Sequence, residues 1–428
     1  MLHMSKWLYL VIAAAMVLSA AGCQPPAARA EARSEKPRVT NPVVDAVDWV
    51  DFVAGNRAFT LDMYHQLTAG EQNLFFSPYS ISTALAMTYA GARNATEAQM
   101  AQVLHTRLPQ DRYHAVLNAL DQSLVLRAEQ ANKDARDSFQ MNIANAVWGQ
   151  HDFQFLPEYL DVLAEYYGAG MRLVDFAGAP DPSRLIINRW VEDQTNQKIK
   201  DLLPEGSVQS DTRLVLTNAI HFKASWLKQF EASATHQAPF TLLDGSIVNV
   251  DMMFQDSGMQ YTSGKGYQLV GIPYAGGQAS MVILLPAEGN FSTFEESLTA
   301  DTLAGMLAEM HHEQVQLSLP RFKLATKFEV ADPLKALGMT DAFDTGMADF
   351  SGMDGRKDLY ITGVYHQAFV DVNEKGTEAA AATGVVVGLT SMPMEPAVVE
   401  VNRPFIFLIY DRSEERRVGK ECRCRWSR

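Results

Sequence analysis

The side chains that could carry out catalysis or bind a metal are not spaced for either task. His311, His312 and Glu313 form the only histidine cluster, but adjacent side chains point away from one another on a helix or strand and make a poor chelate. The chain has no Gly-x-Ser-x-Gly turn, no His-Glu-x-x-His helix and no phosphate-binding loop. We therefore expect a protein that is not an enzyme and has no catalytic residues, no metal site and no cofactor.

The three cysteines lie close to the ends of the chain, at Cys23, Cys422 and Cys424. The 428-residue chain therefore cannot hold a disulfide framework or a cysteine-ligated metal in its body. Its net charge of −14 argues against a nucleic-acid partner. Its hydrophobic content of 47 % is that of an ordinary globular protein and gives no sign of disorder or of a fibrous repeat.

The first 23 residues are typical of an export signal. Lys6 supplies a positive charge, residues 7–18 form an apolar core too short for a permanent membrane anchor, and the segment ends at Cys23. This ending resembles a bacterial lipoprotein signal, in which the cysteine carries the lipid; the alternative is ordinary cleavage after Ala30. Both predict export, as a lipoprotein of the outer membrane or cell surface, or as a periplasmic or extracellular protein. Residues 24–44, rich in proline, alanine and charge, are expected to be a tether.

Helical and strand patterns are interspersed along the rest of the chain. Residues 50–67 carry apolar side chains at helical spacing. Residues 213–222 form an almost unbroken apolar run, which is typical of a central strand buried on both faces. Asn218 lies within that run, and a buried asparagine must find hydrogen-bond partners. Because strict strand–helix–strand alternation is absent, we expect an α+β fold with large antiparallel sheets.

One long segment, residues 373–393, separates two strand patterns and is small and nearly uncharged after Glu378. Loops of this length inside a compact domain are usually functional. Every second residue from Thr377 is small or β-branched, which is typical of a strand that buries one face: Thr377, Ala379, Ala381, Thr383, Val385 and Val387. The segment is therefore a loop by position and a potential strand by pattern.

Four motifs, in order along the chain, resemble those of the serpin family. They are Asn73-Leu-Phe-Phe-Ser-Pro-Tyr-Ser and its continuation to Met87, Thr212-Arg-Leu-Val-Leu-Thr-Asn-Ala-Ile-His-Phe-Lys-Ala-Ser-Trp226, Asn373-Glu-Lys-Gly-Thr-Glu-Ala-Ala-Ala-Ala382 and Asn402-Arg-Pro-Phe-Ile-Phe-Leu-Ile409. The resemblance spans residues 50–411. It implies the serpin fold, with three β-sheets, about nine helices and an exposed reactive-centre loop at residues 374–396, in a domain covering residues 45–413.

The resemblance also implies a metastable, monomeric inhibitor of a serine or cysteine protease. In that family the loop mimics a substrate of the protease. Once the protease is acylated, the loop inserts into the main sheet as an extra strand and traps the acyl-enzyme. The hinge of this loop maps to Glu374, Gly376, Thr377, Glu378, Ala379, Ala380, Ala381 and Ala382. Gly376 permits the backbone turn, and Thr377 is expected to be the first side chain that insertion buries. Glu374 is expected to pair with Arg321 near Trp226, at the top of the sheet.

A buried polar cluster beneath the sheet is implied at Ser77, Ser80, Asn218 and His366. From the residues alone, the two serines are candidate helix caps and His366 is a core histidine with satisfied hydrogen bonds, so its role is structural either way. Family spacing places the cleaved bond fourteen residues beyond Gly376, between Thr390 and Ser391. A small β-branched Thr390 predicts an elastase-like or subtilisin-like target. A shift by one residue, to Leu389–Thr390, predicts a chymotrypsin-like target.

Non-inhibitory members of the family carry bulky, charged or proline residues in the hinge, and this hinge has none after Glu378. Inhibition is therefore favoured over the alternative, a non-inhibitory binding protein of the cell envelope with the same fold. Residues 414–428 depart from the family: six basic and three acidic residues stand where a further buried apolar strand is expected. We interpret this tail as foreign sequence or a shifted reading frame; the competing hypothesis is a basic tail that binds a polyanion or membrane.

Overall fold

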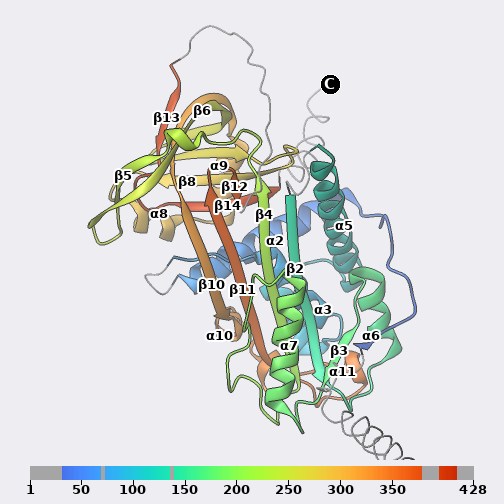
Figure 1. Ribbon diagram of the computed structural model, residues 1–428. Coiled ribbons are helices and arrows are strands. Elements are labelled where there is room, and N and C mark those ends of the chain that lie inside the picture. Colours follow the sequence, from blue (N-terminus) through green and yellow to red (C-terminus); the bar gives the residue numbers. More distant parts are fainter. Residues whose placement is uncertain (1–30, 69–72, 135–138, 378–394, 412–428) are drawn as a thin grey trace, which may run out of the picture.

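The computed structural model describes residues 31–68, 73–134, 139–377 and 395–411 (Figure 1). Its helices lie around two large sheets. In chain order they are α2 (Ala46–Leu67), α3 (Pro78–Tyr89), α4 (Asn94–Val103), α5 (Gln110–Asp134), α6 (Pro157–Val162) with the π-helical turn η1 (Leu163–Tyr167), α7 (Pro180–Gln194), the 3-10 turn η2 (Ala232–Ala234), α8 (Phe291–Ser297), α9 (Ala300–Ala308), α10 (Ala331–Ala336), the 3-10 turn η3 (Asp341–Phe343) and α11 (Ser351–Asp354). Among the described residues, no helix is both long enough and apolar enough to cross a bilayer.

The first sheet carries the features of interest. Its strands, in spatial order, are β1 (Glu31–Ala32), β3 (Met171–Val174), β2 (Phe139–Gln150), β4 (Leu214–Ser225), β12 (Gly376–Thr377), β11 (Ile361–Asn373) and β10 (Phe322–Glu329). β4 is buried at all but one of its residues, as the apolar run at 213–222 predicts. It runs parallel to β11 and antiparallel to β2.

The second sheet lies above the first in Figure 1. Its strands, in spatial order, are β13 (Ala397–Glu400), β9 (His311–Pro320), β6 (Ile247–Gly264), β7 (Tyr267–Pro273), β8 (Ala279–Pro286) and β14 (Ile406–Asp411), and β5 (His236–Thr241) pairs with β6 as well. The α+β class predicted from the sequence is confirmed. The second and third sheets of that expectation form one hydrogen-bonded sheet here, because the long strand β6 pairs with β5, β9 and β7.

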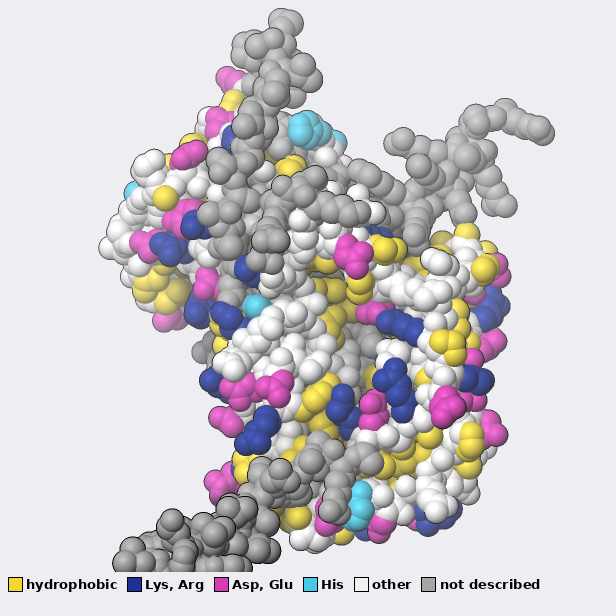
Figure 2. Space-filling model, turned by 45° about the vertical axis from the view of Figure 1, so that its right-hand side comes forward, with side chains coloured by type: hydrophobic (Ala, Val, Ile, Leu, Met, Phe, Trp, Pro, Cys, Tyr) yellow, Lys and Arg dark blue, Asp and Glu magenta, His cyan; other side chains and the backbone are white. Residues whose placement is uncertain are grey.

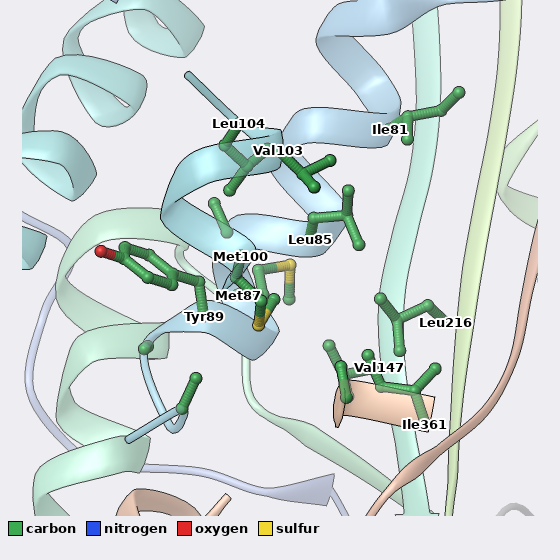
Figure 3. Close-up of a cluster of buried hydrophobic side chains, with 14 of the residues drawn as sticks. Ile81, Leu85, Met87, Tyr89, Met100, Val103, Leu104, Val147, Leu216 and Ile361 are labelled. Carbon is green, nitrogen blue, oxygen red and sulfur yellow. The ribbon is translucent and has the colours of Figure 1, made fainter. Parts of the chain in front are cut away.

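Alternate residues of the first sheet face two different helical layers. Trp148 and Val215 pack with Ile187 of α7 on one face. Val147 and Leu216 pack on the other face with α3 and α5, in the largest core, part of which Figure 3 shows. α3 begins with a capped turn, in which Ser77 Oγ accepts a hydrogen bond from the Ser80 amide at 3.2 Å and Pro78 occupies the first helical position. The central strands β2 and β4 are thus covered on both faces.

Residues 31–44 differ from the expected tether. They lie along the body beside α5 and α6, where Figure 1 shows them as a blue trace, and Glu31–Ala32 joins the first sheet as β1. The proline-rich composition hid this packing, because the attachment is made by hydrogen bonds and ion pairs rather than by an apolar pattern. Residues 1–30, which include Cys23, lie outside the described residues.

Candidate functional site

The expected hinge forms a short strand at the top of the first sheet. After β11 ends at Asn373, the chain turns and β12 returns antiparallel to it, with Thr377 opposite Val372. On its other side β12 is antiparallel to β4, where Thr377 lies opposite Ala224. Lower down, β4 and β11 pair directly over residues 214–221 and 361–369. The hinge therefore already occupies the first position of an additional strand between β4 and β11.

Gly376 begins this strand with φ at +154°, a value that side-chain-bearing residues rarely adopt. Thr377 is fully buried, with 0 % of its surface exposed. We expected insertion to bury this side chain, and the structure corrects that expectation, since it is buried before any further residue of the hinge is in place. Its Oγ1 lies 2.8 Å from the hydroxyl oxygen of Tyr274. The Tyr274 ring stacks on Trp226, with ring centroids 4.7 Å apart and planes 9° apart.

Glu374 is held by three neighbours. Its Oε2 lies 3.6 Å from Arg321 Nε, so the expected pair is present. The Thr235 hydroxyl donates a 2.8 Å hydrogen bond to its Oε1, and the Phe230 amide donates a 2.9 Å hydrogen bond to its carbonyl oxygen. The Arg321 side chain is 46 % exposed, so water screens the ion pair. The hydrogen bonds from Thr235 and Phe230 therefore fix the position of this turn as much as the ion pair does.

Trp226 binds the backbone of the same turn. Its indole Nε1 donates to the Asn373 carbonyl at 2.9 Å, and its amide donates to the Lys375 carbonyl at 3.0 Å. Sequence reasoning identified Trp226 through its motif and missed Tyr274. Tyr274 follows β7 and meets Trp226 through an isolated backbone bridge as well as through the stacked rings. No feature of the sequence around Tyr274 indicates this contact.

The polar cluster beneath the sheet forms one hydrogen-bonded network. Asn218 and His366 are fully buried. The Ser77 amide donates to His366 Nε2 at 3.2 Å, so the proton of the neutral imidazole lies on Nδ1 and is donated to Asn218 Oδ1. Asn218 Nδ2 donates to Ser80 Oγ at 2.6 Å and also to Asn145 Oδ1. Asn145 belongs to β2, opposite Asn218, and sequence reasoning missed it.

This network links four elements: α3 with its cap through the serines, β2 through Asn145, β4 through Asn218 and β11 through His366. It therefore crosses the line along which β4 and β11 must separate if a strand enters between them. The remaining candidate residues lie outside the described part of the chain: Cys23, Glu378, Ala379, Ala380, Ala381, Ala382, Thr390 and Ser391.

Acid is expected to destabilise this network. Burial lowers the pKa of His366 to about 3, from an unfolded value near 6.5. Below pH 6.5 the unfolded chain therefore binds a proton that the native state excludes, and stability falls as the pH drops from 6.5 towards 3. From pH 7 to pH 5 this costs about 2 kcal/mol. Urea denaturation across that range measures the loss, and His366→Gln should reduce its slope; an unchanged slope in the variant contradicts the assignment.

Comparison with known proteins agrees with this geometry. The family model described as serpin (serine protease inhibitor) matches residues 54–418. The chain belongs to the serpin family. It is 40 % identical to human Serpin B3 over 370 residues, covering 83 % of this chain and 94 % of that protein. It is 38 % identical to the leukocyte elastase inhibitor of Xenopus tropicalis over 360 residues, covering 82 % and 93 %.

Among solved structures, the native state of the thermophilic serpin tengpin matches with a TM-score of 0.78 and 28 % identity, over 90 % of this chain and 96 % of that one. Protease inhibition is thus the general activity that membership of this family supports, and a protease is the class of partner. On the face that Figure 2 draws, the Lys and Arg side chains are interspersed with Asp and Glu.

Proposed function

We propose that this serpin inhibits a serine protease as a suicide substrate, by inserting its cleaved loop into the first sheet. The observation that carries the proposal is β12, which has already entered between β4 and β11. Extending it downward would replace the direct pairing of those strands with two antiparallel ladders. In the extended strand, every second residue after Thr377 would lie on the same face as Thr377, which packs with Tyr274. These residues, at positions 379, 381, 383, 385 and 387, are all small or β-branched and therefore suit a buried face.

The chemistry belongs to the protease and the loop together. The hydroxyl oxygen of the protease serine attacks the carbonyl carbon of residue 390, the peptide bond to residue 391 breaks, and the new amino terminus leaves with the proton. Residue 390 is then esterified to the protease. Because its link to residue 391 is broken, the hinge side of the loop becomes free to extend β12. Insertion past the eleven residues from Ala224 to Leu214, ten steps along the strand, would carry the ester about 35 Å along the sheet.

We propose an elastase-like or subtilisin-like target, because the residue before the cleaved bond, Thr390, is small and β-branched. The likeness to a leukocyte elastase inhibitor supports this class. The alternative register, Leu389–Thr390, fits a chymotrypsin-like target. We also propose that the protein is exported and that Cys23 carries a lipid; the signal-like residues 1–23 support both. Action as a monomer is proposed on the family resemblance.

The deciding experiment is incubation of the full-length protein with elastase-, subtilisin- and chymotrypsin-like proteases. Inhibition by insertion should give a covalent adduct that survives SDS. Mass spectrometry of the released fragment should show that it begins at Ser391, or at Thr390 for the other register. Cleavage without an adduct, and without a rise in the thermal stability of the cleaved protein, would instead support the non-inhibitory cell-envelope binding protein.

A further inference from the structure

The N-terminal strap, defined here as residues 31–41, lies against the edge of the first sheet that is far from the hinge. Its first two residues form β1, in which Glu31 lies opposite Arg172 and Ala32 lies opposite Met171 of β3. The strap then leaves the sheet and passes over α6 and η1 to α5, as Figure 1 shows. It is thus bonded to the sheet at one end and to the helical layer at the other.

The middle of the strap binds α6 and η1. Lys36 Nζ lies 3.0 Å from Asp161 Oδ2 and 3.3 Å from Glu165 Oε1. Ser34 Oγ donates a 2.5 Å hydrogen bond to Asp161 Oδ1. The Val39 amide donates to the Glu165 carbonyl at 2.8 Å. The ammonium of Lys36 therefore lies between two carboxylates, and the backbone hydrogen bond of Val39 fixes the register of the strap.

Arg38 carries the contacts with α5. Its Nε donates to Asn118 Oδ1 at 2.9 Å, and its Nη2 donates to Asp121 Oδ2 at 2.7 Å and to the Tyr166 carbonyl at 3.3 Å. The other oxygen of Asp121 accepts a 3.2 Å hydrogen bond from the Tyr79 hydroxyl. Tyr79 belongs to α3, beneath the sheet, so Asp121 joins the strap to α3.

These contacts close a path between the two halves of the sheet. From β3 the path runs through the strap to Arg38, Asp121 and Tyr79, and then along α3 to Ser77, whose amide binds His366 of β11. Entry of a strand between β4 and β11 moves the half formed by β4, β2 and β3 by about 4.8 Å, the spacing of neighbouring strands, relative to β11. The path resists that movement, because its polar contacts lose their geometry within a fraction of this distance.

We propose that the N-terminal strap is a brake on sheet opening, which slows insertion of the loop while residues 31–41 remain bound. This proposal rests on the insertion mechanism proposed above and adds its regulation. Release of the strap removes the connection between β3 and α3. The direct ladder between β4 and β11 and the network at Asn218 then hold the two strands together without the strap. Anything that binds or cleaves residues 31–41 then becomes an activator of insertion.

The test is the rate at which the sheet of the full-length protein accepts a strand from solution. The probe is a fluorescent peptide of residues 378–390, which begins where β12 ends. Its uptake is followed by its anisotropy and by the thermal stability of the complex. In Arg38→Met the apolar stem stays and the hydrogen-bond donors are removed; we expect uptake about tenfold faster, which corresponds to about 1.4 kcal/mol in the barrier. Arg107→Met is the control, since Arg107 is exposed and its side chain makes no hydrogen bond, ion pair or ring contact with the described residues.

Hydrogen exchange at the Val39 amide reports whether the strap has been released. If Arg38→Met leaves this amide protected, the double variant Lys36→Glu with Arg38→Glu, which places like charges against Asp161 and Asp121, releases it. Faster exchange at Val39 with unchanged or slower peptide uptake overturns the brake and leaves insertion intact. If neither the variants nor the natural chain take up the peptide, the result counts against the insertion mechanism itself.

Discussion

Thr377→Arg is expected to convert the protein from an inhibitor into a substrate that its protease cleaves and releases. Thr377 is fully buried, and its hydroxyl is within 2.8 Å of the Tyr274 hydroxyl. A guanidinium at this position has no acidic partner, so its burial costs several kcal/mol. The resting variant avoids this cost by leaving β12 out of the sheet, so insertion must then bury the guanidinium. A cost of about 3 kcal/mol at that step slows insertion more than 100-fold. The acyl-enzyme then hydrolyses first, and SDS gels should show cleaved protein in place of the covalent adduct.

Two variants isolate the cause. Lys375→Arg places the same guanidinium two residues earlier, at an exposed position, and should form the adduct as the natural protein does. Tyr274→Phe removes the hydroxyl contact without adding charge, so it tests whether the resting position of β12 matters by itself; the adduct should persist. Insertion is the wrong mechanism if Thr377→Arg forms the adduct as efficiently as Lys375→Arg.

The sequence predicted the hinge well because the relevant information is local. Alternation from Thr377 onward indicates a segment that can become a strand, and Asn218 in an apolar run requires polar partners. The structure shows the partners of Asn218 and the strand position of Thr377, whereas residues 378–394 lie outside the described residues, so the rest of the alternation stays a prediction. What alternation cannot show is how far insertion has proceeded at rest, because that depends on the space between β4 and β11 and on Tyr274, which approaches from the other sheet.

Two groups of contacts escaped prediction for a common reason. Asn145 and Tyr274 reach the site from strands that are distant in sequence, and neither lies in a family motif. The strap was missed because Asp161 and Glu165 look like ordinary solvated positions on a helix. In addition, the composition of residues 24–44, rich in proline, alanine and charge, is that of a linker. Polar contacts between two exposed surfaces produce no periodic pattern in the sequence, whereas burial of an apolar face produces one.

The second large effect is expected at Asn218. Asn218→Ala removes the acceptor of the His366 Nδ1 proton and the donor to Ser80 and Asn145, all within a buried network. Leaving buried polar groups without partners costs about 1–3 kcal/mol each, so we expect a loss of about 3–5 kcal/mol. Urea denaturation of the uncleaved protein measures it as a lower midpoint.

The control for this loss is Asn142→Ala, which changes an asparagine of β2 that is half-buried and should lower the midpoint far less. The position of Asn218 adds a functional consequence. Because the network connects β4 with β11, its loss should also speed the spontaneous disappearance of inhibitory activity on gentle heating, without any cleavage of the loop. A variant that is less stable in urea and yet keeps its activity as long as Asn142→Ala would show that the network stabilises the core but does not hold the two strands together. In that case the closure of the sheet depends on the direct ladder between residues 214–221 and 361–369.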